Sequence, residues 1–191
     1  MAAVGLADGI QSANVVGYTT RQTVSGFNFL APTFEPVDGT GNVNIQDIKL
    51  DAGTAESWSD NLQILDDGGA TIATYGYATA EESGLDADGW LTGEGELADI
   101  TIPFGAGILI DTANESSVTF AGQVATEDSA IEAVAGFNFT GNNSPTVINI
   151  QDIKLGETAE SWSDNLQILD EGGATIATYG YATAEERGVG E

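Results

Sequence analysis

The stretch TAESWSDNLQILD occurs at residues 54–66 and again, letter for letter, at residues 158–170. The match extends on both sides of it. NIQDIKL stands at 44–50 and 149–155, GGATIATYGYATAEE at 68–82 and 172–186, and VSGFNF at 24–29 corresponds to VAGFNF at 134–139. Such an internal repeat predicts two units that fold alike and bury the same faces. We divide the chain into an N-terminal arm or leader remnant (1–14), a first β repeat (15–125) and a second, truncated β repeat (126–191).

Apolar residues alternate with a period of two in both units, which predicts β-strands. In the first unit the alternating residues are Phe27 and Phe29, Leu62 and Ile64, Ala73, Tyr75 and Tyr77, Ile100, Ile102 and Phe104, Ile108 and Ile110, and Val118 and Phe120. Residues 66–69 and 170–173 predict hairpin turns, because their glycines adopt the positive φ that a tight turn needs. Short helical turns are expected only after Thr54 and Thr79. The expected fold class is all-β: an antiparallel β-sandwich built from a tandem duplication, with the second repeat incomplete.

The second unit ends at Glu191 without a counterpart of residues 90–124. In the first unit this segment supplies eight alternating apolar residues, and burying each one stabilises a fold by roughly 1.5–3 kcal/mol. Their sum exceeds about 10 kcal/mol, which is comparable with the net stability of a whole domain. Three solutions are open: one core shared by both units, a sheet completed by another chain, or a truncated unit with an open edge.

The charge balance excludes several partners. Thirty acidic residues stand against four basic ones, so the net charge is −26, and the chain has no histidine and no cysteine. Nucleic acids and anionic membranes both require the lysines and arginines that this surface lacks. No apolar run is long enough for membrane insertion. The small polar residues and an opening that is similar to the tail of a secretory signal indicate an exported protein, extracellular or on the cell surface.

Without histidine and cysteine the usual general base and zinc ligands are missing, so we expect no enzyme and no required cofactor. Ca²⁺ is the ligand that the sequence favours most. LDADGW at 85–90 is similar to the front half of a D-x-D-G calcium loop, which makes Asp86 and Asp88 the candidate ligands. The competing interpretation is a solvated turn.

Aromatic residues recur at matching positions in the two units. Trp58 and Trp162 lie within ESWSDNL, where they either stack on a sugar or serve as packing residues, and packing is the more common role. The tyrosine pairs invite the same two interpretations, with an aromatic ridge as one form of the first. They are Tyr75 and Tyr77, and Tyr179 and Tyr181.

The N-terminal residues carry an alternating apolar pattern of their own. The candidate assembly arm consists of Val4, Leu6, Ile10, Val15, Val16 and Tyr18. An extended arm with this spacing can add as a strand to an open sheet on another molecule. Repeated head to tail, such a contact does not close and yields a filament. A disordered tail or a leader remnant is the competing expectation.

ANVVGYTT, GFNFLAP, NIQDIKL, LQILDDGGATIATYGY, PFGAGILI and VTFAGQV together resemble a group of uncharacterised exported bacterial β-repeat proteins of the surface or the extracellular medium. The resemblance implies export, an all-β fold and no known catalytic residues. The expected function is a non-enzymatic structural subunit of an extracellular filament or surface layer, with other copies of itself as partners. The alternative is a secreted β-sandwich module that binds a polysaccharide or another ligand.

Overall fold

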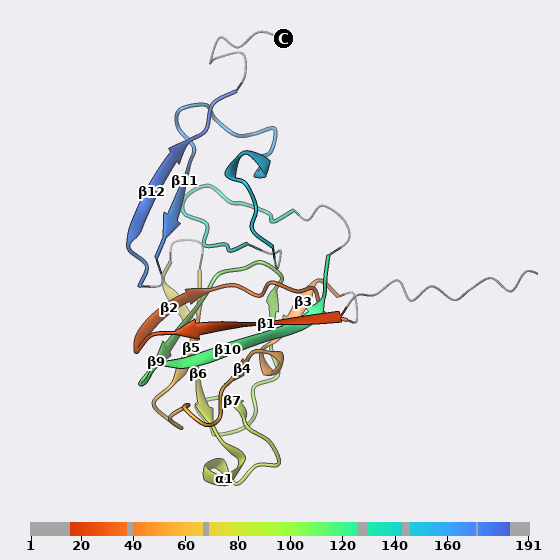
Figure 1. Cartoon of the computed structure of the whole chain (residues 1–191), viewed down its shortest axis with the longest axis vertical. Coiled ribbons are helices and arrows are strands. Elements are labelled where there is room, and N and C mark those ends of the chain that lie inside the picture. The colour runs from red at the N-terminus through yellow and green to blue at the C-terminus, as the bar shows by residue number, and fades with distance from the viewer. Residues whose placement is uncertain are drawn as a thin grey trace, which may run out of the picture.

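A computed structural model describes residues 16–37, 40–66, 69–125, 130–142, 146–170 and 172–183. Its regular structure is almost entirely antiparallel β, as predicted (Figure 1). The elements are β1 (Val16–Thr23), β2 (Gly26–Leu30), β3 (Asn42–Asn44), η1 (Ile45–Asp47), β4 (Lys49–Leu50), β5 (Asn61–Leu65), β6 (Thr71–Ala78), α1 (Ala80–Ser83), β7 (Gly89–Leu91), β8 (Thr101–Pro103), β9 (Ile108–Thr112), β10 (Ser116–Gln123), η2 (Ile150–Asp152), β11 (Asn165–Leu169) and β12 (Thr175–Gly180).

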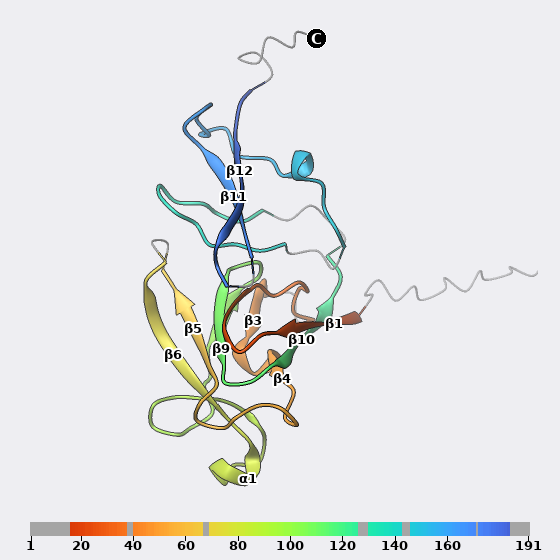
Figure 2. The same ribbon diagram turned by 60° about the vertical axis from the view of Figure 1, so that its left-hand side comes forward.

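The first repeat forms a sandwich-like arrangement of packed sheets. One sheet has five strands in the order β2-β9-β5-β6-β7, a second has three in the order β1-β10-β4, and β3 pairs with β8. Figure 2 shows the three-stranded sheet lying across one face of the larger one. Strands from the early part of the repeat (β2, β5) are thus joined in one sheet by β9, which comes from its end.

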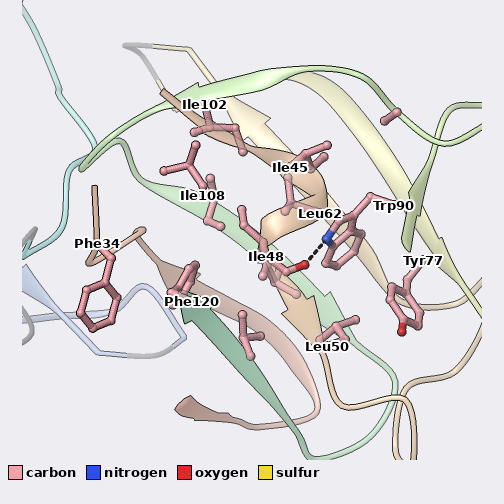
Figure 3. Close-up of a cluster of buried hydrophobic side chains, with 14 residues drawn as sticks. Phe34, Ile45, Ile48, Leu50, Leu62, Tyr77, Trp90, Ile102, Ile108 and Phe120 are labelled. Atoms are coloured by element: carbon pink, nitrogen blue, oxygen red, sulfur yellow. Dashed lines mark hydrogen bonds between the residues drawn. The ribbon is translucent and has the colours of Figure 1, made fainter. Parts of the chain in front are cut away.

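The apolar core lies wholly within the first repeat (Figure 3). Its buried members are Phe34, Val43, Ile45, Ile48, Leu50, Leu62, Tyr77, Trp90, Ala98, Ile102, Ile108, Ile110, Val118 and Phe120. Trp90 is fully buried, and its Nε1 donates a hydrogen bond to the carbonyl oxygen of Ile48 at 2.7 Å. Six of the eight apolar residues expected to be important in residues 90–124 belong to this core, while Ile100 packs at its margin and Phe104 is half-buried.

Local sequence signals explain most of the elements. Every second residue of β10 is buried, as period-two alternation requires. Thr79 caps α1 by accepting a hydrogen bond from the Glu82 main chain, whereas the segment after Thr54 forms turns without a helix. The predicted hairpin turn before β6 also forms: Gly69 has a φ of 81° and donates its N–H to the carbonyl oxygen of Asp66.

The burial phase of β2 is the opposite of the predicted one. Phe27 is exposed and Phe29 half-buried, whereas Asn28 between them is buried. The Asn28 side chain donates to the carbonyl oxygens of Val24 and Gly26 and accepts from the N–H of Val24, so the turn before β2 is organised around it. A polar residue that satisfies the main chain of a turn therefore takes the inner position.

In the described residues of the second repeat, the regular structure consists of the hairpin β11–β12 and the short helix η2, and the rest is irregular. None of its described residues is buried, so it contributes no member to the core. A single core shared by both repeats, one of the three solutions considered above, is therefore wrong for the part of the chain that the structure describes.

Candidate functional site: the open edge of the second repeat

The hairpin of the second repeat copies that of the first, strand for strand. In the first, Leu62 lies opposite Tyr75, and the register shifts between Ile64 and Leu65. In the second, Leu166 lies opposite Tyr179, with the same shift between Ile168 and Leu169. Identical sequences have therefore formed identical local structure.

The two hairpins differ in what lies beside them. β5 is flanked by β6 and by β9, whereas β11 pairs with β12 alone. No described residue outside its own hairpin forms a main-chain hydrogen bond with β11. The outer edge of β11 is thus an unfilled copy of the edge at which β5 receives β9.

Polar side chains around this edge retain their local hydrogen bonds and lack the long-range ones. In the first repeat Asp60 is buried, accepting from the main chain of Glu56 at 2.8 Å and from that of Ala113 at 2.7 Å. In the second repeat Asp164 accepts from Glu160 through Oδ2 at 2.8 Å, and its Oδ1 has no partner among the described residues.

Gln46 and its counterpart Gln151 show the same difference. The Gln46 side chain donates to the carbonyl oxygens of Trp90 and Ala98 and accepts from the Trp90 main chain, so it holds β7 in place. The counterpart Gln151 is exposed, and its side-chain amide bonds to nothing in the described chain. The turn that contains it is nevertheless preformed, because Asn149 caps η2 as Asn44 caps η1.

Apolar residues near η2 in the second repeat are correspondingly exposed. Ile48 is 1% exposed and its counterpart Ile153 40%, while Leu50 is 6% exposed and its counterpart Leu155 39%. Main-chain groups and apolar side chains are therefore both available for a β segment that another polypeptide supplies.

Phenylalanine side chains and hairpin turns join the two repeats reciprocally. Phe29 and its counterpart Phe139 stack with ring centroids 6.1 Å apart. Phe139 lies against Gly69 in the turn of the first repeat, and Phe29 lies against Gly173, the matching turn residue of the second. A side chain at either glycine would meet a ring, so the contact requires glycine at both positions.

Main-chain bonds hold the second repeat at the same junction. Gly107 donates to the carbonyl oxygen of Phe139 at 2.9 Å, and Gly141 donates to that of Gly105 at 3.1 Å. Thr140 adds a side-chain bond to the Gly105 carbonyl oxygen at 2.9 Å. None of these contacts involves the outer edge of β11, because they are made to the connection between β8 and β9.

The predicted assembly arm lies partly in the described chain. Val16 and Tyr18 belong to β1, where Val16 lies opposite Gln123 and Tyr18 opposite Ala121 of β10. These two are therefore not a loose segment: donating them to another molecule would break the pairing of β1 with β10. The other four arm residues lie outside the described residues; they are Val4, Leu6, Ile10 and Val15.

Both repeated tryptophans are exposed, so the packing role expected for them is wrong. Trp58 is 59% and Trp162 70% exposed. They have φ angles of 67° and 64°, in the left-handed region that a bulky residue rarely adopts. In each repeat the Trp main chain donates to the tyrosine carbonyl that ends the hairpin, at 2.8 Å.

The tyrosines do not form an exposed ridge in the first repeat. Tyr77 is buried and meets Trp90 edge-on with centroids 5.4 Å apart, and Tyr75 is half-buried. Burial, together with the negative charges of Asp88, Asp60 and Asp51, raises the pKa of Tyr77 to about 12. In the second repeat Tyr179 is 46% exposed and Tyr181 half-buried.

Asp88 and Asp86, the candidate calcium ligands, lie in the turn between α1 and β7. The Asp88 Oδ1 accepts a hydrogen bond from the Ala80 main chain at 2.6 Å, which ties this turn to the start of α1. Asp86 is exposed. No group of three or more acidic side chains suited to a metal ion occurs among the described residues, so Ca²⁺ stays a prediction.

A shallow groove of about 690 Å³ lies on the first repeat. Among its lining residues are Asn42, Asn44, Asp47, Lys49 and Thr101, and neither tryptophan is one of them. A ligand stacked on Trp58 would therefore bind outside this groove.

The first repeat is a complete sandwich-like unit. The second repeat copies its β5–β6 hairpin as β11–β12, without a described strand in the place of β9. No protein-family model, curated protein or solved structure matches the chain. In the described part of the chain, no helix has the length and apolar character that crossing a bilayer requires.

Proposed function

We propose that the protein is a non-enzymatic structural subunit of an extracellular filament or surface layer, whose copies join head to tail by β-strand addition. One observation carries the proposal: β11 repeats the sequence and the pairing of β5, yet nothing described fills the place that β9 has beside β5. An open sheet edge accepts a strand from another chain, and the second repeat also exposes apolar side chains that are buried in the first. A contact between unlike surfaces, repeated from copy to copy, builds a filament.

The composition supports the rest of the proposal. The chain has no histidine or cysteine, and its net charge of −26 keeps subunits apart except where a specific contact outweighs the repulsion. Ca²⁺ screens such a surface, so we expect it to strengthen the assembly.

Sedimentation velocity and negative-stain microscopy of the full chain, with and without Ca²⁺, test this function. The wild-type protein is expected to form polymers. Ile168→Lys places a charge at the edge of β11 and should leave monomers, because lysine protects open sheet edges. Ile72→Lys is the matched control: Ile72 is 66% exposed on the complete repeat, and its replacement should leave polymers intact. Wild-type protein that stays monomeric at all concentrations contradicts the proposal.

A secreted ligand-binding module is the second candidate, and the backbone of the two tryptophans favours it. A non-glycine residue held at positive φ costs stability and is enriched at functional sites. Two exposed indoles at equivalent positions offer flat stacking surfaces for a polysaccharide. Titration of soluble glycans, followed by tryptophan fluorescence, tests this function. Trp58→Ala and Trp162→Ala should each remove part of the signal, and a monomer that binds glycans would favour this candidate.

A further inference from the structure

We propose that the strand which fills the edge of β11 is formed by residues 4–9 of a second copy, antiparallel to β11 and in the register that β9 has on β5. This inference rests on the proposed function and names the donor for the same site. It follows from three requirements that β5 places on its partner and from the N-terminal sequence.

The first two requirements are aliphatic residues at alternate positions. The pairs across the first repeat are Ile108 with Ile64, Leu109 with Gln63, Ile110 with Leu62 and Asp111 with Asn61. Ile108 and Ile110 are fully buried, so these two positions must be aliphatic, whereas Thr112, the next residue on the same face, is buried but polar. Asp111 is half-buried and Asn61 opposite it is polar, so this position tolerates charge, although Leu109 on the same face is buried.

The third requirement is a main-chain N–H donor three residues after the second aliphatic position, which is Ile110 in β9. Ala113 gives its N–H to Asp60 at 2.7 Å, which satisfies a carboxylate that is 1% exposed. In the second repeat the equivalent oxygen of Asp164 has no partner in the described chain. A matching strand therefore has aliphatic residues at positions one and three and an available N–H at position six.

Residues 4–9 read VGLADG and meet all three requirements. Val4 takes the place of Ile108 opposite Ile168, and Leu6 takes that of Ile110 opposite Leu166. Ala7 falls at the tolerant position of Asp111, and Asp8 takes the place of Thr112, the buried polar residue of β9. Gly9 takes the place of Ala113, so its N–H faces the unpaired oxygen of Asp164.

Other strands of a second copy fit less well. Its β9 is already held between β2 and β5. Pairing β11 with another β11, with Leu166 opposite Ile168, would set Asp164 against Asp170 at both ends, and opposed like charges destabilise a sheet. The chain's own arm is disfavoured because β1 starts on the side away from the β11–β12 hairpin in both views (Figures 1 and 2).

Matched charge substitutions in the arm test the pairing. Leu6→Asp buries a charge against Leu166 and should lower the association constant by roughly 10- to 100-fold. Ala7→Asp adds the same charge one residue later, on the face where β9 itself carries Asp111, and should leave association within about threefold of wild type. Sedimentation equilibrium measures both. Equal effects of the two substitutions overturn the register.

Disulfide trapping tests the partner directly, because the chain has no cysteine of its own. Gly5 is expected opposite Gln167, so chains with Gly5→Cys mixed with chains with Gln167→Cys should give disulfide-linked dimers under mild oxidation. Neither variant alone should do so. Gln63→Cys is the matched control, since Gln63 lies in the same five-residue sequence but already has Leu109 opposite it.

The outcomes separate this inference from the proposed function. A wild-type protein that polymerises while Gly5→Cys links no better to Gln167→Cys than to Gln63→Cys keeps the structural function and removes this donor. A chain carrying both Gly5→Cys and Gln167→Cys should form a ladder of linked oligomers. Linked monomers from that chain would place the arm on its own second repeat and overturn the intermolecular pairing. A protein that never associates removes both proposals.

Discussion

Tyr77 couples the stability of the core to alkaline pH. Its pKa is raised from 10.0 to about 12, first by burial and then by the charges of Asp88, Asp60 and Asp51. The folded state therefore favours the protonated phenol. The resulting stabilisation is complete below the unfolded pKa and is lost as pH rises through the folded one, from about pH 10 to about pH 12. Urea unfolding measured across this range should show the loss. Tyr77→Phe should flatten that part of the profile, and an unchanged slope in this variant would contradict the assignment.

Trp58 has a left-handed backbone conformation, which is unfavourable for a residue that has a Cβ atom. Its φ of 67° is left-handed and its side chain is mostly exposed, so packing does not compensate for the strain. Because left-handed backbone costs a non-glycine residue roughly 1–2 kcal/mol, Trp58→Gly should raise the free energy of unfolding by about 1 kcal/mol. Trp58→Ala, which keeps the Cβ, should not. Denaturant titration distinguishes the two, and a destabilised Trp58→Gly variant would show that the indole contributes to packing after all.

Strands β5 and β11 have the same sequence, but the strands beside them determine how much each one contributes to stability. Leu62 and Leu166 share the same flanking sequence, yet Leu62 is fully buried whereas Leu166 is half-buried at an open edge. Leu62→Ala should lower the free energy of unfolding of the first repeat by about 2–5 kcal/mol, because it opens a cavity in a packed core. Leu166→Ala should lower the free energy of unfolding of the second repeat by less than about 1 kcal/mol. Urea unfolding of both variants, measured on monomeric protein, compares them, and similar losses would mean that the second repeat has a core of its own.

The elements themselves could be predicted from the sequence because their causes are local. The turn at Asp66 and Gly69, the cap at Thr79 and the alternation in β10 each depend on a few neighbouring residues. Burial phase was harder to predict. Asn28 took the inner position of β2 because the turn before it needed hydrogen-bond partners, and no alternation pattern contains that information.

An unfilled edge was one of three solutions that the sequence left open for the second repeat, and its detailed chemistry was not predicted. The partners of Asp60 and Gln46 lie about fifty residues further along the chain and become neighbours only when the sheets assemble. The positive φ of Trp58 and Trp162 likewise gave no sequence signal, since glycine or asparagine is the usual residue there.

The whole molecule combines a closed repeat with an open one through a junction of reciprocal contacts. Phe29 and Phe139 each pack against the turn of the other repeat, so the junction is reciprocal, with an approximate two-fold relation between its halves. A fixed junction orients the open edge of β11 relative to the first repeat (Figure 1). Subunits added at that edge would therefore follow one another with a constant rotation, which is the condition for a regular filament.

Amide hydrogen exchange measures the difference between the repeats within a single molecule. Residues 61–65 and 165–169 have the same sequence, so their unprotected exchange rates match closely and any difference reports structure. In monomeric protein the amides of β5 that face β9 should exchange only through global unfolding, because they lie in the centre of a five-stranded sheet. The corresponding amides of β11 should exchange close to the unprotected rate, while those that face β12 should show intermediate protection. Under assembly conditions the β11 amides should become protected in the wild-type protein and stay unprotected with Leu6→Asp. Full protection of β11 in the dilute Leu6→Asp variant would show that the chain closes its own second repeat, and strand addition would then have no site.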